Sequence, residues 1–101
     1  MELTKMKNLN KKELYKLAIE AYGREERINK GIEEMAELIK AVIRYNSMLE
    51  NYIRWYDIVE GIVNVEIMLE QYKQIYEIPD KVLSEFKSKK LQELSETIDD
   101  D

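Results

Sequence analysis

Apolar residues recur at helical spacing along most of this chain, and that periodicity constrains its fold more than any other feature of the sequence. A stripe of apolar side chains at about 100° per residue predicts an amphipathic helix with one buried face. Asn10 and Glu13 form a capping-box pattern and Gly23 is a natural stop, so a first helix is expected over about 11–22. A second helix is expected over about 24–45, where a single stripe contains Ile28, Ile32, Met35, Ile39, Val42 and Ile43.

Two further helices are predicted in the second half of the chain. Ser47 and Glu50 form another capping-box pattern, and the segment from there to about residue 77 is too densely apolar for a single face. This third helix is therefore expected to be the most buried. Pro79 and Asp80 mark a turn and a new helix start, which is followed by the apolar residues Val82, Leu83, Phe86, Leu91 and Leu94.

The composition is that of a helical bundle. Hydrophobic residues make up 45% of the chain and charged residues 37%, with only 3 glycines and 1 proline. Connections of a few residues place sequential helices antiparallel, so we expect an all-α, up-and-down helical bundle. A chain of 101 residues has room for one domain with a modest core, and dimerisation is expected to complete its burial. Within this single domain, 1–101, the segments 1–9 and 97–101 are expected to be flexible.

The residue content excludes several kinds of site. Neither cysteine nor histidine occurs, which excludes a disulfide framework, thiolate and imidazole metal ligands, and a histidine base. The net charge of -5 argues against nucleic-acid binding, which depends on clustered lysine and arginine. The chain starts without the apolar run of a signal peptide, and no stretch approaches the ~20 apolar residues of a membrane span. We therefore expect a protein of the cytoplasm.

The second predicted helix carries the first group of candidate metal ligands. Glu34 and Glu37 lie three positions apart, with Glu33 beside them, and can converge on one ion. Their oxygen atoms suit Mg²⁺, which keeps several of its own water ligands. The alternative is a solvated acidic face that is balanced by Lys30 and Lys40, and the spacing alone favours this simpler interpretation.

The third predicted helix carries a polar stripe inside an otherwise apolar segment. Asp57, Glu60 and Asn64 fall within an arc of about 60° when the helix is wound at about 100° per residue. A buried carboxylate must be paired, hydrogen-bonded or metal-bound, because leaving it bare costs several kcal/mol. If this stripe faces Glu34 and Glu37, a pocket lined by carboxylates lies between the two helices. A stripe that simply faces water explains the same pattern equally well.

Three passages resemble the short MazG-like nucleoside triphosphate pyrophosphohydrolases of Gram-positive bacteria and their phages, and the resemblance covers about residues 13–96. The passages are IEEMAELIKA at 32–41, VEIMLEQ at 65–71 and EFKSKKL at 85–91. The resemblance implies an all-α fold in dimers or dimers of dimers, with Mg²⁺ held by a Glu-Glu-x-x-Glu helix and a following Glu-x-x-Asp. It also implies cleavage of a nucleoside triphosphate to the monophosphate and pyrophosphate by metal-activated water.

The sequence departs from that family pattern at two of the four expected anionic ligands. The positions that match the Glu and the Asp of Glu-x-x-Asp are Gly61 and Asn64. Asparagine offers an uncharged oxygen and glycine offers no side chain, so ion affinity and water activation should fall together. Glu60 lies one position off, whereas Asp57 lies one turn earlier on the stripe and could substitute in part. Glycine inside a helix costs roughly 1 kcal/mol relative to alanine, so Gly61 indicates space for a ligand, a close helix contact, or drift.

These observations favour a nucleotide-binding protein with impaired catalysis, in which Mg²⁺ is weakly bound or absent. It would act as a phage-type sponge that sequesters a small nucleotide or nucleotide-derived immune signal, and it would form a homodimer or homotetramer. Trp55 is a candidate for stacking on a base, although packing in a core or interface is the commoner role of such an aromatic. The other candidate ligand-binding residues are Lys40, Arg44, Arg54, Gly61 and Asn64.

Two other functions stay open on the sequence alone. The first is an active Mg²⁺-dependent pyrophosphohydrolase, in which Asp57 or Glu60 completes the metal shell and Glu34 and Glu37 serve in catalysis. The second is a non-catalytic helical interaction module that binds no nucleotide.

Overall fold

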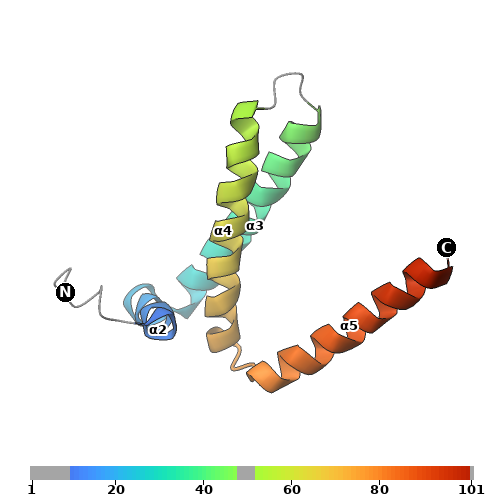
Figure 1. Ribbon diagram of the computed structural model, residues 1–101. Coiled ribbons are helices and arrows are strands. Elements are labelled where there is room, and N and C mark those ends of the chain that lie inside the picture. Colours follow the sequence, from blue (N-terminus) through green and yellow to red (C-terminus); the bar gives the residue numbers. More distant parts are fainter. Residues whose placement is uncertain (1–9, 48–51, 101) are drawn as a thin grey trace.

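The computed structural model describes residues 10–47 and 52–100, and within these ranges the chain is helical apart from short connections (Figure 1). Its four helices there are α2 (Lys11–Tyr22), α3 (Arg24–Ser47), α4 (Tyr52–Ile75) and α5 (Asp80–Asp100). The all-α class is confirmed, and α3 and α4 run antiparallel as in an up-and-down bundle (Figure 1). The predicted flexible segment 1–9 lies outside the described residues, whereas α5 continues through residues 97–100. None of the described helices is both long and apolar enough to cross a membrane.

Local signals in the sequence explain both ends of α2. The Asn10 side chain accepts a hydrogen bond from the Glu13 N–H at 2.8 Å and donates one to the Glu13 carboxylate at 3.1 Å. These two bonds satisfy the predicted cap at the start of the helix. Gly23 ends the helix with a φ of 92°, a backbone conformation that favours glycine, and α3 begins at the next residue.

The predicted capping role of Ser47 is wrong. Ser47 is the last residue of α3, and its hydroxyl approaches the Arg44 carbonyl oxygen at 3.5 Å. A serine with helical backbone can bond back to the preceding turn, and its side chain is then not directed at the next helix. Glu50, the other half of the pattern, lies outside the described residues, and α4 is described from Tyr52.

Helices α3 and α4 form a hairpin whose facing residues make up most of the core. These residues alternate at spacings of three and four positions, as in a coiled coil, and all of them are buried or half-buried. We call them the seam: Arg27, Gly31, Glu34, Leu38, Ala41 and Tyr45 of α3, with Arg54, Ile58, Gly61, Val65, Met68, Tyr72 and Ile75 of α4. Among the described helices α4 has the most buried positions, as predicted.

Two glycines of the seam allow the helices to approach closely. A Cβ atom at Gly61 would lie 3.1 Å from Leu38 Cδ1 and 3.3 Å from Leu38 Cα, so the close helix contact is the observed reason for a glycine there. Gly31 lies under the ring of Tyr72, whose hydroxyl donates a hydrogen bond to the Ile28 carbonyl at 2.6 Å. The two contacts lock the position of α4 along α3.

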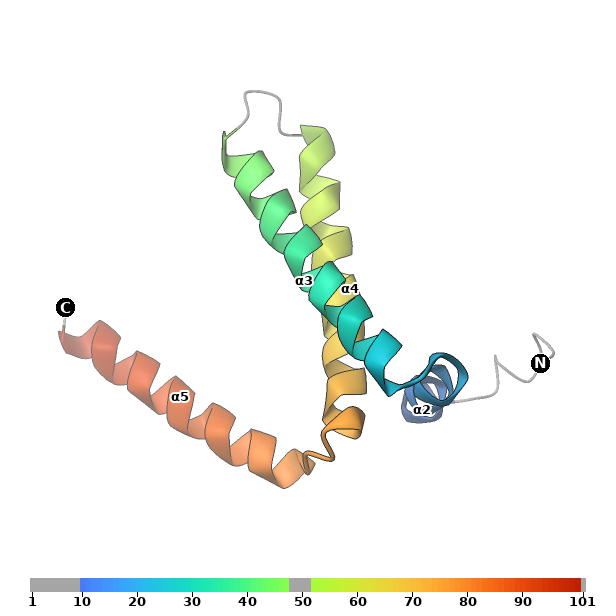
Figure 2. The ribbon, with the colours of Figure 1, turned by 180° about the vertical axis from the view of Figure 1, so that it is seen from behind.

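The remaining helices are attached to this hairpin very differently. Helix α2 contacts α3 and α4 near the start of α3, where Gln74 Nε2 donates to the Lys12 carbonyl at 2.9 Å. Helix α5 points away from the other helices in both views and makes at most marginal contact with them (Figures 1 and 2). In the described part of the chain the buried hydrophobic side chains are Ala41 and Met68. A single chain therefore leaves much of its apolar surface uncovered.

Candidate functional site

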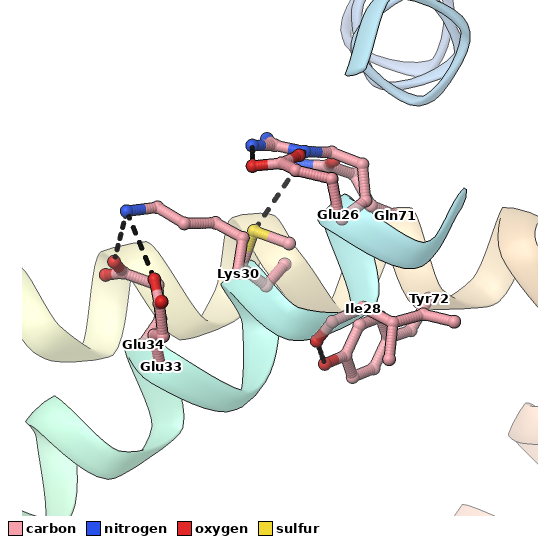
Figure 3. A network of polar contacts seen from close by, with 9 residues as sticks. Glu26, Ile28, Lys30, Glu33, Glu34, Gln71 and Tyr72 are labelled. Carbon is pink, nitrogen blue, oxygen red and sulfur yellow. Dashed lines mark hydrogen bonds and ion pairs between the residues drawn. The ribbon is translucent and has the colours of Figure 1, made fainter. Parts of the chain in front are cut away.

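The α3–α4 hairpin has a polar side and an apolar side. Leu38 faces Gly61. Each helix turns by about 100° per residue, and the two helices run antiparallel. Residues at equal sequence offsets from Leu38 and from Gly61 therefore lie on the same side of the hairpin. Figure 3 shows Lys30, Glu34 and Gln71 on one side, with the Tyr72–Ile28 contact on the other. The polar side comprises Lys30, Glu34, Glu37, Asp57, Glu60, Asn64 and Gln71. The apolar side comprises Ile32, Met35, Ile39, Val42, Ile43, Trp55, Val59, Ile62, Leu69 and Tyr76.

The predicted metal ligands all lie on the polar side, but they are not gathered at one point. Asn64 and Glu34 are at the same level of the hairpin, and both are half-buried. Glu37, Asp57 and Glu60 are exposed, and Asp57 lies about 10 Å along α4 from Asn64. Over residues 10–47 and 52–100, no three acidic side chains come close enough together to hold one metal ion.

The chain itself supplies a cation to the Glu34 carboxylate. Lys30 Nζ lies 3.3 Å from Glu34 and 3.9 Å from Glu33 (Figure 3). The Glu34 side chain is only 16% exposed, so solvent screens this contact less than the contact to Glu33, which is 68% exposed. These residues fit Mg²⁺ poorly, because the ammonium repels a second cation at the same carboxylate. These contacts agree with the Lys30 part of the predicted acidic face, whereas Lys40 makes no ion pair within the described residues and Glu34 is half-buried rather than solvated.

Gln71 is the most deeply buried residue of the polar side, at 3% exposure. Its Nε2 donates to Met68 Sδ at 3.7 Å, while its Oε1 has no hydrogen-bond partner among the described residues. A buried polar atom without a partner is uncommon in a folded protein. At about 100° per residue Gln71 continues the stripe of Asp57, Glu60 and Asn64, but its burial depends on the neighbouring helices and could not be inferred from that stripe. The amide oxygen is therefore an unused acceptor that is itself buried, so a ligand would reach it only after neighbouring side chains move.

The predicted base-stacking and phosphate-binding residues are distributed around the hairpin. Trp55 precedes Asn64 by nine positions, about half a turn around α4, so the two lie on opposite sides. Arg54 is half-buried in the seam, whereas Lys40 and Arg44 are exposed on α3. A ligand that contacts both Trp55 and Asn64 would have to reach around the hairpin or touch two different chains.

Two open grooves adjoin α2. The larger one, about 1190 Å³, lies between α2 and α4, and its lining includes Lys12, Tyr15, Ala18, Ile67, Gln71 and Gln74. The smaller one, about 570 Å³, lies at the corner of α2 and α3, and its lining includes Tyr22, Arg24, Glu26, Lys30 and Glu33. Neither of these two grooves includes Glu37 or Asn64. The polar side opens onto them through Gln71 and Lys30 instead.

The Tyr72 hydroxyl gives the hairpin a dependence on alkaline pH. Burial, with a smaller effect from nearby Tyr76, raises the pKa of Tyr72 above its ordinary value of 10.0, so folding favours the neutral hydroxyl. The stability that this group contributes is complete below about pH 10 and is lost as pH rises through the higher folded pKa. We expect Tyr72→Phe to lower the free energy of unfolding by about 1 kcal/mol at neutral pH and to weaken the decline above pH 10.

Urea denaturation of both proteins between pH 7 and pH 11 measures these two effects. Tyr22→Phe is the matched control, because Tyr22 is exposed, its hydroxyl makes no hydrogen bond within the described residues, and phenylalanine keeps the ring over which Arg27 lies. An equal decline with pH in the wild-type protein and in Tyr72→Phe would contradict the assignment to Tyr72.

Comparison of this chain with protein-family models, with curated proteins and with solved structures found no match. A small all-helical fold does not by itself indicate one family. The resemblance to the MazG-like pyrophosphohydrolases therefore stays a prediction from the three sequence passages.

Proposed function

We propose that this chain binds a small nucleotide or nucleotide-derived ligand and retains it without cleaving it. The observation that carries the proposal is the Lys30–Glu34 pair on the same side of the hairpin as the unpartnered Gln71 amide oxygen. An ammonium can meet a phosphate, and an amide oxygen can accept a hydrogen bond from a base or a ribose. Because Lys30 already pairs with Glu34, less of the charge of that carboxylate is left for a divalent metal.

The proposed biological role is that of a sponge, which lowers the free concentration of a nucleotide-derived signal by binding it. The order of the three MazG-like passages supports a nucleotide as the ligand class, and Gly61 and Asn64 in place of two acidic ligands support loss of turnover. A homodimer, or a dimer of dimers, is the proposed assembly, because the apolar side of the hairpin is uncovered in a single chain.

A thermal-shift screen with product analysis tests this function. The full-length chain is heated with nucleoside triphosphates, cyclic dinucleotides and ADP-ribose derivatives, each with and without Mg²⁺. A ligand at about 100 times its Kd stabilises the native state by about 2.7 kcal/mol, which corresponds to roughly 10 °C in Tm for a chain of this size. We expect such a shift without Mg²⁺, and intact ligand should be recovered after denaturation.

Two substitutions test whether the ligand-induced shift in Tm depends on residues of the polar side. Lys30→Gln removes the ammonium next to the half-buried Glu34, and we expect it to reduce the ligand-induced shift by at least half. Glu33→Gln is the matched control on the exposed flank, and it should leave the shift nearly unchanged. Release of pyrophosphate that requires Mg²⁺ and is lost in Glu37→Gln would show the active enzyme instead.

The uncovered apolar side favours a second candidate, a helical interaction module that binds another protein. Ile39 and Ile43 of α3 are each 61% exposed, and Trp55 of α4 is 49% exposed. Such patches on soluble proteins often mark interaction surfaces. This candidate predicts no shift in Tm with any nucleotide, whereas the proposed function requires one.

A further inference from the structure

Helix α5 is amphipathic, and none of the other described helices covers its apolar face. Its apolar residues occupy about half of the circumference at about 100° per residue: Val82, Leu83, Phe86, Leu91, Leu94 and Ile98. Phe86 is 63% exposed, Leu94 55% and Ile98 64%. Helices in proteins gain most of their stability from packing an amphipathic face, so an isolated α5 lacks its main source of stability.

The corner between α4 and α5 determines where this face can go. Glu77 adopts a φ of 51°, its N–H donates to the Gln74 carbonyl at 3.1 Å, and the Ile78 N–H donates to the Lys73 carbonyl at 2.9 Å. This pair of bonds is a Schellman motif, and Pro79 follows it as the residue that cannot continue a helix. The motif directs α5 away from its own hairpin (Figures 1 and 2). Folding α5 back onto the same chain would require a different backbone path through Ile78 and Pro79, the residues between this motif and α5.

The exposed area of the chain is large enough for an extensive interface. The chain exposes 8490 Å², whereas a compact monomer of 12.1 kDa exposes about 6000 Å². The excess of about 2500 Å² refers to all 101 residues, and it is about three times the roughly 800 Å² that each partner buries in a standard interface. A second copy of the same chain exposes the same apolar surfaces, and a two-fold symmetric dimer would bury those of both copies.

We propose that α5 packs on the apolar side of the α3–α4 hairpin of a second copy of this chain. The lengths agree, because 21 residues of helix span about 31 Å and the 24 residues of each hairpin helix span about 36 Å. The α5 helix of each copy thus packs on the hairpin of the other copy, so that both hairpins are covered. This assembly is independent of the proposed nucleotide binding, and either can fail without the other.

Sedimentation velocity over a range of concentrations tests the contribution of α5. Leu94→Glu places a charge in the apolar face, and Ser88→Glu places the same charge on the polar face as a matched control. We expect the wild-type chain and Ser88→Glu to dimerise with similar Kd, and Leu94→Glu to dimerise roughly 10-fold to 100-fold more weakly. A monomeric wild-type chain, or equal Kd in all three proteins, overturns the proposal.

Cross-linking shows which chain receives α5 and needs no variant of its apolar face. Because the chain has no cysteine, Ser84→Cys on the polar face of α5 provides one attachment point for a photoreactive cross-linker. Dimers are formed from equal amounts of unlabelled and ¹⁵N-labelled chains, and cross-linked peptides are sorted by isotope. We expect mixed-isotope links from α5 to α3 or α4. Links within one chain only, or links between two α5 helices only, overturn the proposal.

Discussion

Replacing Gly31 by alanine is expected to lower the free energy of unfolding by about 2 kcal/mol and Tm by roughly 10 °C. A Cβ atom at this position would overlap the hydroxyl and Cζ of Tyr72 and lie 2.7 Å from its Cε1. The rigid ring must therefore leave its place and give up the hydrogen bond to the Ile28 carbonyl. Alanine gains about 1 kcal/mol over glycine inside a helix, but that gain is smaller than the cost of displacing the ring. Urea denaturation followed by circular dichroism measures the net effect.

The same substitution in a Tyr72→Ala background isolates the contact. Removing the ring removes the three atoms that lie nearest to a Cβ atom at residue 31, so Gly31→Ala is expected to stabilise the protein by up to about 1 kcal/mol. The sign of the effect thus reverses between the two backgrounds, which is the signature of coupled positions. Equal destabilisation in both backgrounds would show that the ring is not the obstacle.

Gly61→Glu, which introduces the acidic residue that the MazG-like pattern has at this position, is expected to disrupt the hairpin rather than to create a metal site. The new side chain would begin 3.3 Å from Leu38 Cα, and backbone cannot move aside as a flexible side chain can. Its carboxylate would also be buried in the seam without a partner, at a cost of several kcal/mol. Because whole domains are stable by only about 5–15 kcal/mol, we expect loss of the cooperative thermal transition.

Two controls separate the position of this change from its charge. Val63→Glu introduces the same residue two positions later, where the native side chain is 48% exposed, and it should change stability by less than about 1 kcal/mol. Asn64→Asp adds a carboxylate at the other position where the MazG-like pattern has an acidic residue. Asn64 is half-buried, and this change should leave the fold intact. If Gly61→Glu were as stable as Val63→Glu, α3 and α4 would not be in close contact at this level.

Local signals in the sequence predict where helices begin and end, because each such signal involves only a few neighbouring residues. Asn10 caps α2, Gly23 ends it, and Pro79 precedes α5, and all three positions could be assigned before the fold was known. The prediction for Ser47 was wrong because it relied on a short local pattern alone. A serine followed three positions later by a glutamate has the spacing of a cap, but the periodicity of α3 continues through Ser47 and decides its backbone conformation.

The contacts that hold the helices together could not be predicted in the same way. The Tyr72 hydroxyl and the Ile28 carbonyl lie 44 positions apart, and no local pattern identifies Gly31 as the space for that ring. The sequence likewise places α5 among the helices of a bundle, because spacing does not reveal the direction of the turn at Glu77. Long-range packing decides both features.

The candidate site was predictable in its outline only. Helical spacing puts Glu34 and Glu37 on one helix and Asp57, Glu60 and Asn64 on the other, and the structure places all five on the polar side of one hairpin. Exposure separates them in a way that spacing cannot show, because only Glu34 and Asn64 are half-buried. The ion pair of Lys30 with Glu34 follows the familiar four-residue helical spacing, which makes it the most readily foreseen contact of the site.

The residues that pack α3 against α4 and the residues of the polar side are largely different, which affects how such a protein can change in evolution. Steric fit at Gly31 and Gly61 defines the hairpin, while the groups suited to meeting a ligand stand beside that line. Exchanging an exposed flanking side chain such as Glu37 or Glu60 therefore costs the fold little, whereas the buried Gln71 is less replaceable. Single substitutions at the exposed positions can thus change the charge of this face while the hairpin stays folded.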